Sequence, residues 1–180
     1  MRIISGLHKG RRITAPKQLP IRPTTDMAKE GLFNIINNRF HFKGLTVLDL
    51  FSGSGNIAYE FGSRGAGPII AVDANIDCVK FIKKTAIELD LDITPVKSDV
   101  FKYLEKAPVT ADLVFADPPY DLEEDQFEKI ILLVMERNIL NPKGILIIEH
   151  SKHTKLTALE NYSESRKYGN SVFSFFVPKP

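Results

Sequence analysis

The sequence predicts an α/β fold: a mostly parallel sheet of seven strands with helices on both faces, closed by a C-terminal antiparallel hairpin. Two observations predict it. From Lys43 onward, short apolar runs alternate with amphipathic stretches of about 10 to 15 residues, as in βαβ units. Near the C-terminus this rhythm stops, and the runs at 160–167 and 171–177 flank the turn sequence Tyr168-Gly169-Asn170.

Five apolar runs are the expected parallel strands, and the stretches between them carry apolar residues at helical spacing. Ile76, Val79 and Ile82 form one such stripe, and Phe127 and Ile130 begin another. The strands are predicted at 45–50, 68–72, 93–96, 111–116 and 144–149. The helices are predicted from the glycine turn to about Arg64, over 76–89 and around 127–134.

Residues 1–42 are predicted to form a short extension, a hairpin followed by a helix, in front of a core at 43–180. The β-like runs Arg2–Ser5 and Arg11–Thr14 flank a loop with two glycines, which indicates a weak hairpin. Thr24 to Asp26 can cap a helix that reaches about Asn38. Between these elements we expect extended backbone, because the chain there contains Pro16, Pro20 and Pro23.

Composition limits the class of protein. The 180 residues suit one domain, and 43% hydrophobic with 26% charged residues excludes a disordered chain. No apolar run reaches the roughly 18 to 20 residues of a membrane span, and the first residues lack the apolar core of a secretory signal. With one cysteine, Cys78, and no Cys/His cluster, we expect no internal disulfide and no metal. A cytoplasmic location is expected.

Charge is distributed unevenly along the chain, although the net charge is only +2. Residues 1–45 contain nine Lys or Arg against Asp26 and Glu30, whereas the rest of the chain is mildly acidic. A basic segment on an acidic body favours a polyanionic partner such as nucleic acid. A solvated basic face remains the alternative.

Polar residues follow four of the predicted strands, and in an open α/β sheet ligands bind beyond the strands' carboxyl ends. Asp49 precedes a turn with Gly53 and Gly55 that lets backbone approach a ligand, although a tight turn without ligand has the same pattern. Asp73 ends the second strand, where an acid can accept hydrogen bonds from ribose hydroxyls. Asp99 follows the third and could receive an exocyclic amine or cap a helix.

These three positions suit a nicotinamide cofactor as well as another adenosine cofactor, and the fourth strand end separates the two. There Asp117-Pro118-Pro119-Tyr120 follows the strand directly. The two prolines remove N–H donors and leave carbonyl oxygens, with a carboxylate before them and an aromatic ring after. Such a site accepts hydrogen bonds and offers a stacking face, which suits a planar base with an amino group. An ordinary Pro-Pro turn is the alternative.

With these motifs the chain resembles class I S-adenosylmethionine-dependent amino-methyltransferases, which have a Rossmann-like fold. The extension narrows the resemblance to the RsmD family, the bacterial 16S ribosomal RNA guanine-N2-methyltransferases, across essentially the whole chain. Met27 and Asn56 depart from that family's pattern, which commonly has a basic and a small residue there. The motifs that resemble the family are R-I-I-S-G-x-x-K-G-R near the start, R-P-T-T-D at 22–26, L-F-N at 32–34, S-R-G-A at 63–66, I-E-H-S at 148–151 and Y-G at 168–169.

The resemblance implies a role for each matching position. S-adenosylmethionine would be bound by Asp49, Phe51, Gly53, Ser54, Gly55, Asp73, Ala74, Asp99, Val100 and Asp117. The methylation of a guanine amine would be carried out by Asp117, Pro118, Pro119 and Tyr120, with the acid and the Pro118 carbonyl accepting N2 protons and the ring stacking on the base. RNA would be contacted by Arg2, Lys9, Arg11, Arg12, Arg22, Thr24 and Thr25.

The implied partner is 16S rRNA in the small ribosomal subunit or a late assembly intermediate, and a monomer is expected. An adenine-N6 methyltransferase shares the Asp-Pro-Pro-Tyr motif, but such enzymes resemble one another in having a separate target-recognition domain. A nicotinamide-dependent oxidoreductase would leave Asp117 to Tyr120 without a purpose. A non-catalytic RNA-binding relative would not need motifs at all four strand ends.

Overall fold

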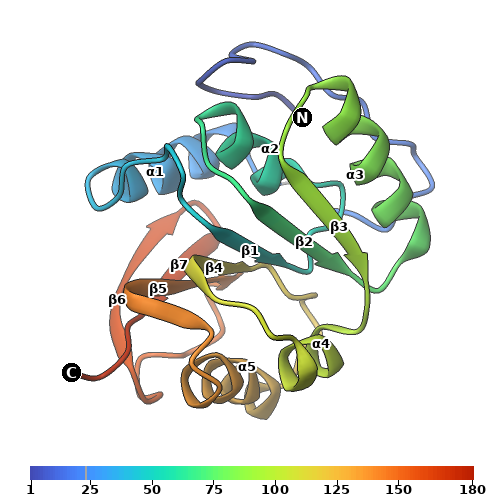
Figure 1. The fold of residues 1–180 in the computed structure, drawn as a ribbon. Helices are drawn as coiled ribbons and strands as arrows, with labels where there is room; N and C mark the ends of the chain where they lie inside the picture. The colour runs from blue at the N-terminus through green and yellow to red at the C-terminus, as the bar shows by residue number, and fades with distance from the viewer. Residues whose placement is uncertain (23) are drawn as a thin grey trace.

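A computed structural model describes residues 1–22 and 24–180 of the chain. The predicted extended backbone at Pro23 lies outside these residues. The fold is a seven-stranded sheet in the order β3-β2-β1-β4-β5-β7-β6 (Figure 1). Its strands are β1 Val47–Leu50, β2 Ile69–Asp73, β3 Ile93–Lys97, β4 Ala111–Ala116, β5 Leu140–Ser151, β6 Tyr162–Tyr168 and β7 Ser171–Phe176.

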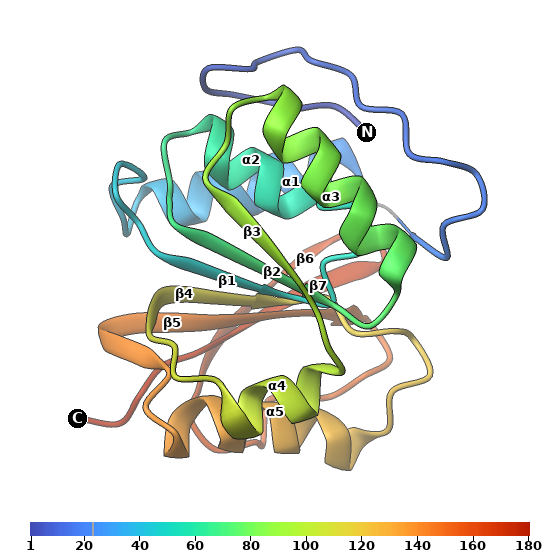
Figure 2. The same cartoon turned by 45° about the vertical axis from the view of Figure 1, so that its right-hand side comes forward.

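The first five strands run parallel, and helices cover both faces of the sheet (Figure 2). One face carries α1 Asp26–Asn37, α2 Asn56–Ser63 and α3 Ile76–Glu88, and the other carries α4 Val100–Lys106 and α5 Glu124–Glu136. Each layer has its own apolar core, because alternate strand residues point to opposite faces. Val47 therefore packs toward α1 and α2, and Leu48 packs toward α5.

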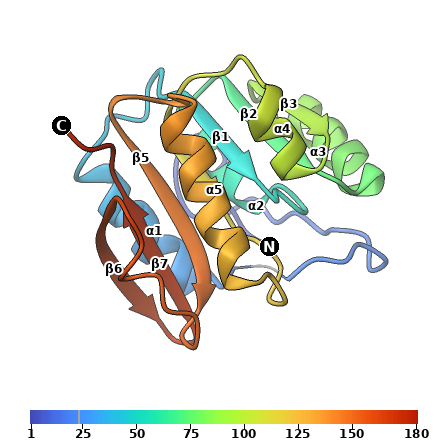
Figure 3. The same cartoon turned by 90° about the horizontal axis from the view of Figure 1, so that it is seen from below.

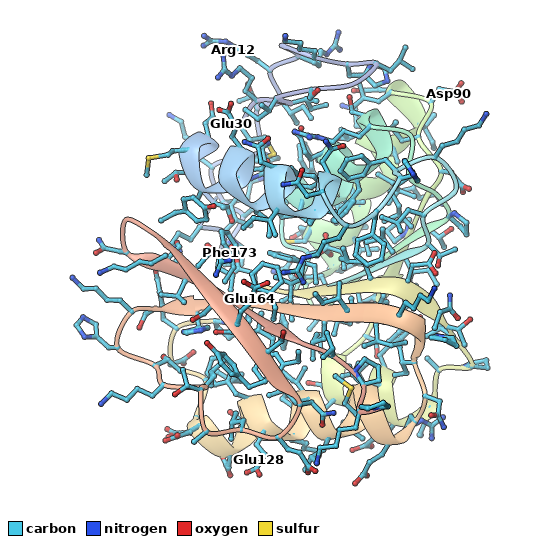
Figure 4. All side chains as sticks on the ribbon, turned by 90° about the vertical axis from the view of Figure 1, so that its left-hand side faces the viewer. Arg12, Glu30, Asp90, Glu128, Glu164 and Phe173 are labelled. Carbon is cyan, nitrogen blue, oxygen red and sulfur yellow. The ribbon has the colours of Figure 1, made fainter. Side chains whose placement is uncertain are left out.

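The C-terminal hairpin extends the sheet beyond β5. β7 pairs antiparallel with β5 and with β6, so that the hairpin and β3 lie at opposite edges of the sheet (Figure 3). Phe173 and Phe175 on β7 are fully buried in the core that α1 shares, and Figure 4 shows Phe173 between that helix and the sheet. The predicted fold class and closing hairpin are confirmed.

The N-terminal hairpin is less regular than expected. Arg2 and Arg12 form an isolated antiparallel bridge, and the N–H of Ile3 donates to the Arg11 carbonyl at 2.9 Å. Strand pairing stops there because the next two N–H groups, of residues 4 and 5, donate instead to the buried carboxylate of Glu60 at 2.9 and 3.1 Å. The segment thus lies over α2 and α3, with Arg12 at the outer edge of the molecule (Figure 4).

The predicted element boundaries agree with the structure to within a few residues, with two differences. β5 begins at Leu140, before the predicted start at 144. The residues after Asp99 form α4, and Asp99 caps this helix by accepting the Lys102 N–H at 3.0 Å. In the described parts of the chain no helix is long and apolar enough to cross a membrane, and no His, Cys, Asp or Glu cluster is suited to a metal ion.

Candidate active site

A cavity of about 600 Å³ lies at the carboxyl ends of β1 to β4. The parallel register brings these four strand ends to one edge of the sheet, as the sequence predicts. Its volume is in the range of small-molecule sites. The predicted residues that line it are Asp49, Phe51, Gly53, Ser54, Asp73, Ala74, Asp99, Val100, Asp117, Pro118, Pro119 and Tyr120, together with Arg22 and Thr24 of the extension.

The turn after β1 is joined to the acid that ends β2. The Gly53 N–H donates to Oδ2 of Asp73 at 2.8 Å, and the Asn75 N–H donates to Oδ1 at 2.8 Å. These two bonds hold the carboxylate in place at the cavity wall, and each oxygen keeps a further lone pair for a ligand. Asp73 can therefore accept two hydrogen bonds from one ligand.

Gly55 shapes the turn before α2. Its N–H donates to the Ser52 carbonyl at 2.8 Å, so this amide is engaged inside the turn. The residue has φ +84° at the start of α2, and a Cβ there would lie 2.6 Å from the Tyr59 ring. The glycine is therefore required by the left-handed backbone and by packing, and Gly55 does not line the cavity that the described residues enclose.

Asp49 is a buried acid at the cavity with capacity for a ligand. The residue is 1% exposed, and its Oδ2 meets no hydrogen-bond donor within the described parts of the chain. Burial, with the charge of Asp73 as a second cause, raises the pKa of Asp49 well above its ordinary value. An unsatisfied buried oxygen is costly, so a cationic or N–H-bearing ligand group at this position would stabilise the site.

At the end of β4, Asp117 lies between opposing charges. Burial is the main cause that raises the pKa of Asp117 well above its ordinary value, Glu149 raises it further, and Arg22 opposes both. Pro118 is buried, whereas Tyr120 is 65% exposed. This strand end therefore offers a half-buried acceptor and an exposed aromatic ring in the lining of the cavity.

The ring of Tyr120 is already in contact with the extension. The Arg22 guanidinium carbon lies 3.3 Å from the ring centroid, a cation–π arrangement. A flat ligand that stacks on this face must displace Arg22 or use the opposite face.

Among the predicted RNA contacts, three more besides Arg22 have structural partners. Arg2 pairs with Asp26, with 3.2 Å between Nε and Oδ2. Thr24 is buried and donates to Glu149 at 2.7 Å, and Thr25 caps α1 by accepting the Ala28 N–H at 3.2 Å. Both threonines thus hold the chain around α1. Lys9, Arg11 and Arg12 are exposed on the segment over α3.

Several residues at the site were not predicted from the sequence. Glu149 lies beside Asp117, because β5 and β4 are paired up to Ile148 and Ala116. The sequence could have indicated it, because Glu149 is the last residue of the fifth predicted strand, and each of the other four predicted parallel strands is followed by a candidate binding residue. Asn56 lines the cavity beside the glycine turn, and its signal was the departure from the family pattern. The other residues that line the cavity and were not predicted are Leu19, Pro20, Ile21, Ser52, Ile57 and Phe115.

Comparison with known proteins gives a consistent set of relatives. Residues 1–177 match the family described as conserved hypothetical protein 95. The chain is 34% identical over 161 residues to YlbH of Bacillus subtilis (strain 168), and the alignment covers 87% of this chain and 85% of YlbH. It is 31% identical over 150 residues to ribosomal RNA small subunit methyltransferase D of Buchnera aphidicola subsp. Baizongia pistaciae. That alignment covers 83% of this chain and 75% of the Buchnera protein.

A solved structure supports the same grouping. YhhF of Escherichia coli superposes with a TM-score of 0.85 and 26% identity, over 98% of this chain and 96% of that one. At this coverage the similarity extends through the N-terminal segment as well as the sheet.

Proposed function

Because the chain belongs to the RsmD family, that of ribosomal RNA small subunit methyltransferase D, we propose that it methylates the exocyclic N2 of a guanine in 16S rRNA. The methyl donor is S-adenosylmethionine, and the fold is that of class I methyltransferases that use it. The observation that carries the proposal is Asp117-Pro118-Pro119-Tyr120 in the same cavity as Asp49 and Asp73.

The residues of the cavity suit the donor at each strand end. Asp73, held by two N–H groups, would accept the ribose hydroxyls, and Asp99 and Val100 at the start of α4 would flank the adenine. The buried Oδ2 of Asp49 would accept from the ammonium group of the methionine part. When bound, the donor supplies an electrophilic methyl group on a sulfonium.

Asp117 is proposed to orient the attacking amine. The lone pair of an aromatic amine is delocalised into the ring, which makes the nitrogen a poor nucleophile. Two acceptors, the Asp117 carboxylate and the Pro118 carbonyl, would take its two N–H groups and direct the lone pair at the methyl. The carboxylate also stabilises the positive charge that develops on nitrogen, and a buried site strengthens this effect. Tyr120 would stack on the base.

Residues 1–42 are proposed to be the RNA-binding part, with 43–180 as the catalytic core. Lys9, Arg11 and Arg12 are exposed and basic, and Arg22 connects this segment to Tyr120 in the lining of the cavity. Contacts of this kind with phosphates position an RNA without reading its bases. We propose 16S rRNA in the small subunit, or in a late assembly intermediate, as the partner, with the protein acting as a cytoplasmic monomer.

The test is methylation with labelled S-adenosylmethionine of small subunits from cells that lack this protein, followed by location of the label. We expect one labelled nucleotide, a guanine methylated at N2, in 16S rRNA. Label on adenine N6 would support the alternative amino-methyltransferase. An unlabelled product, together with calorimetric binding of a nicotinamide cofactor and not of S-adenosylmethionine, would overturn the proposal.

A further inference from the structure

Asn56 has an unusual environment for a residue in the wall of the cavity. It is the first residue of α2 and is 8% exposed. Its Oδ1 accepts a hydrogen bond from the Lys29 ammonium at 2.9 Å, and its Nδ2 lies 3.5 Å from the Thr24 carbonyl. An ammonium group donates and cannot accept, so Lys29 requires the oxygen of the amide to face it. Nδ2 therefore lies on the Thr24 side, where it donates to that carbonyl, and the second of its two N–H groups is left for a further acceptor. Both Asn56 and Thr24 line the cavity.

Lys29 is itself held in place. It is 1% exposed on α1, and its Nζ also donates to the Arg2 carbonyl and lies 3.4 Å from Oε2 of Glu60. Burial lowers its pKa, and Glu60 opposes that shift. With these partners Lys29 is held beside Asn56, and its ammonium selects the amide oxygen as the end that faces it.

The order of the strands indicates which part of the donor lies near Asn56. Adenine beside Asp99 at β3 and ribose on Asp73 at β2 leave the methionine part beyond β1, where α2 begins. That part ends in a carboxylate, which needs donors in a buried site. The beginning of α2 carries partial positive charge, and the Asn56 amide presents N–H groups beside it.

We propose that Nδ2 of Asn56 donates a hydrogen bond to the α-carboxylate of the methionine part of S-adenosylmethionine, in an orientation set by Lys29. The inference rests on the proposed function, because it assumes this donor. It makes Asn56 a binding residue and Lys29 a positioning residue. The competing explanation is that the amide only joins α1 to α2.

The experiment measures dissociation constants by calorimetry for three compounds. S-adenosylmethionine and S-adenosylhomocysteine have the carboxylate, and 5′-methylthioadenosine has the same adenosine without the amino acid. We expect Asn56→Ala to weaken the first two by about 10- to 100-fold, as for a bond to a charged group, and to change the third less than about twofold. Asp73→Ala should weaken all three, since each contains the ribose, and Asn34→Ala on the exposed face of α1 should weaken none.

A second variant distinguishes a lost hydrogen bond to the ligand from a folding defect. Asn56→Asp keeps an acceptor for Lys29 but replaces the donor with a second carboxylate oxygen, so it should discriminate against the carboxylate compounds at least as strongly. An equal loss for 5′-methylthioadenosine, or no loss for any compound, would overturn the inference and leave the proposed function intact. If the unaltered protein binds none of the three compounds, the proposed function fails as well.

Discussion

The hydroxyl of Thr24 donates a 2.7 Å hydrogen bond to the buried carboxylate of Glu149, which joins the segment before α1 to the strand beside Asp117. Burial raises the pKa of Glu149, and the bond from Thr24 opposes that shift. The contact links residues 125 positions apart, so it holds the extension against the catalytic end of the sheet.

Removing the Thr24 hydroxyl should destabilise the protein. Thr24→Val keeps the shape but leaves a buried carboxylate without this donor, which costs about 1 to 3 kcal/mol. For a chain of this size we expect the melting temperature to fall by roughly 2 to 12 °C. Thr24→Ser, which keeps the donor, should recover most of the loss, and Thr157→Val at an exposed threonine is the control. A Thr24→Val protein as stable as Thr157→Val would contradict this role.

Substitution of Asp117 separates two mechanisms. If its carboxylate orients the amine, Asp117→Asn retains an acceptor oxygen and should lose roughly 10- to 1,000-fold, because the charge is gone. Asp117→Ala should lose more. The measurement is single-turnover methylation of small subunits at saturating donor. Equal and complete loss in both variants would favour a general base instead.

The rate should also depend on pH through Asp117. Its raised pKa means that part of the carboxyl is protonated at the acid end of the assay range, and a protonated carboxyl is a poorer acceptor. We therefore expect the single-turnover rate of the unaltered protein to rise with pH and that of Asp117→Asn to lack this dependence. The same slope in both proteins would assign the titration to another group.

The basic segment should make RNA binding sensitive to salt. Replacing Arg11 and Arg12 by Ala should reduce the slope of log affinity against log salt by about 0.7 to 0.9 for each lost phosphate contact. The dissociation constant for S-adenosylmethionine should not change. Arg137 and Lys143, exposed near the start of β5 and away from the cavity, provide a matched control pair. A slope unaffected by the Arg11 and Arg12 substitutions would show that the segment is only a solvated face.

Asp49 should reduce stability as pH rises. Its pKa is raised in the folded protein, so its contribution is complete below the unfolded value, near 3.8, and is lost as pH rises through the folded value. Asp49→Asn removes this loss. Relative to the unaltered protein, the variant should gain free energy of unfolding between about pH 4 and about pH 7.5. Denaturant unfolding at both values measures it, with Asp121→Asn as an exposed control. A difference that is independent of pH would refute the burial of this charge.

The sequence by itself determined the sheet, every helix except α4 and the residues at four strand ends. Periodicity is a local property, and parallel strands place their carboxyl ends at one edge whatever the details of packing. For this reason Asp49, Asp73, Asp99 and Asp117 could be brought into one cavity without coordinates. The family resemblance then implied a role for each of these residues.

Only the tertiary structure decided which hydrogen-bond partner each of these polar groups has. The hydrogen bond from Thr24 to Glu149 depends on a partner that is distant in the chain, and the bond from the Gly55 N–H to the Ser52 carbonyl depends on turn geometry. The orientation of Asn56 likewise depends on Lys29, which reaches it from another helix. A hydrogen bond needs about 3 Å and a defined angle between two groups, and spacing along a sequence contains neither quantity.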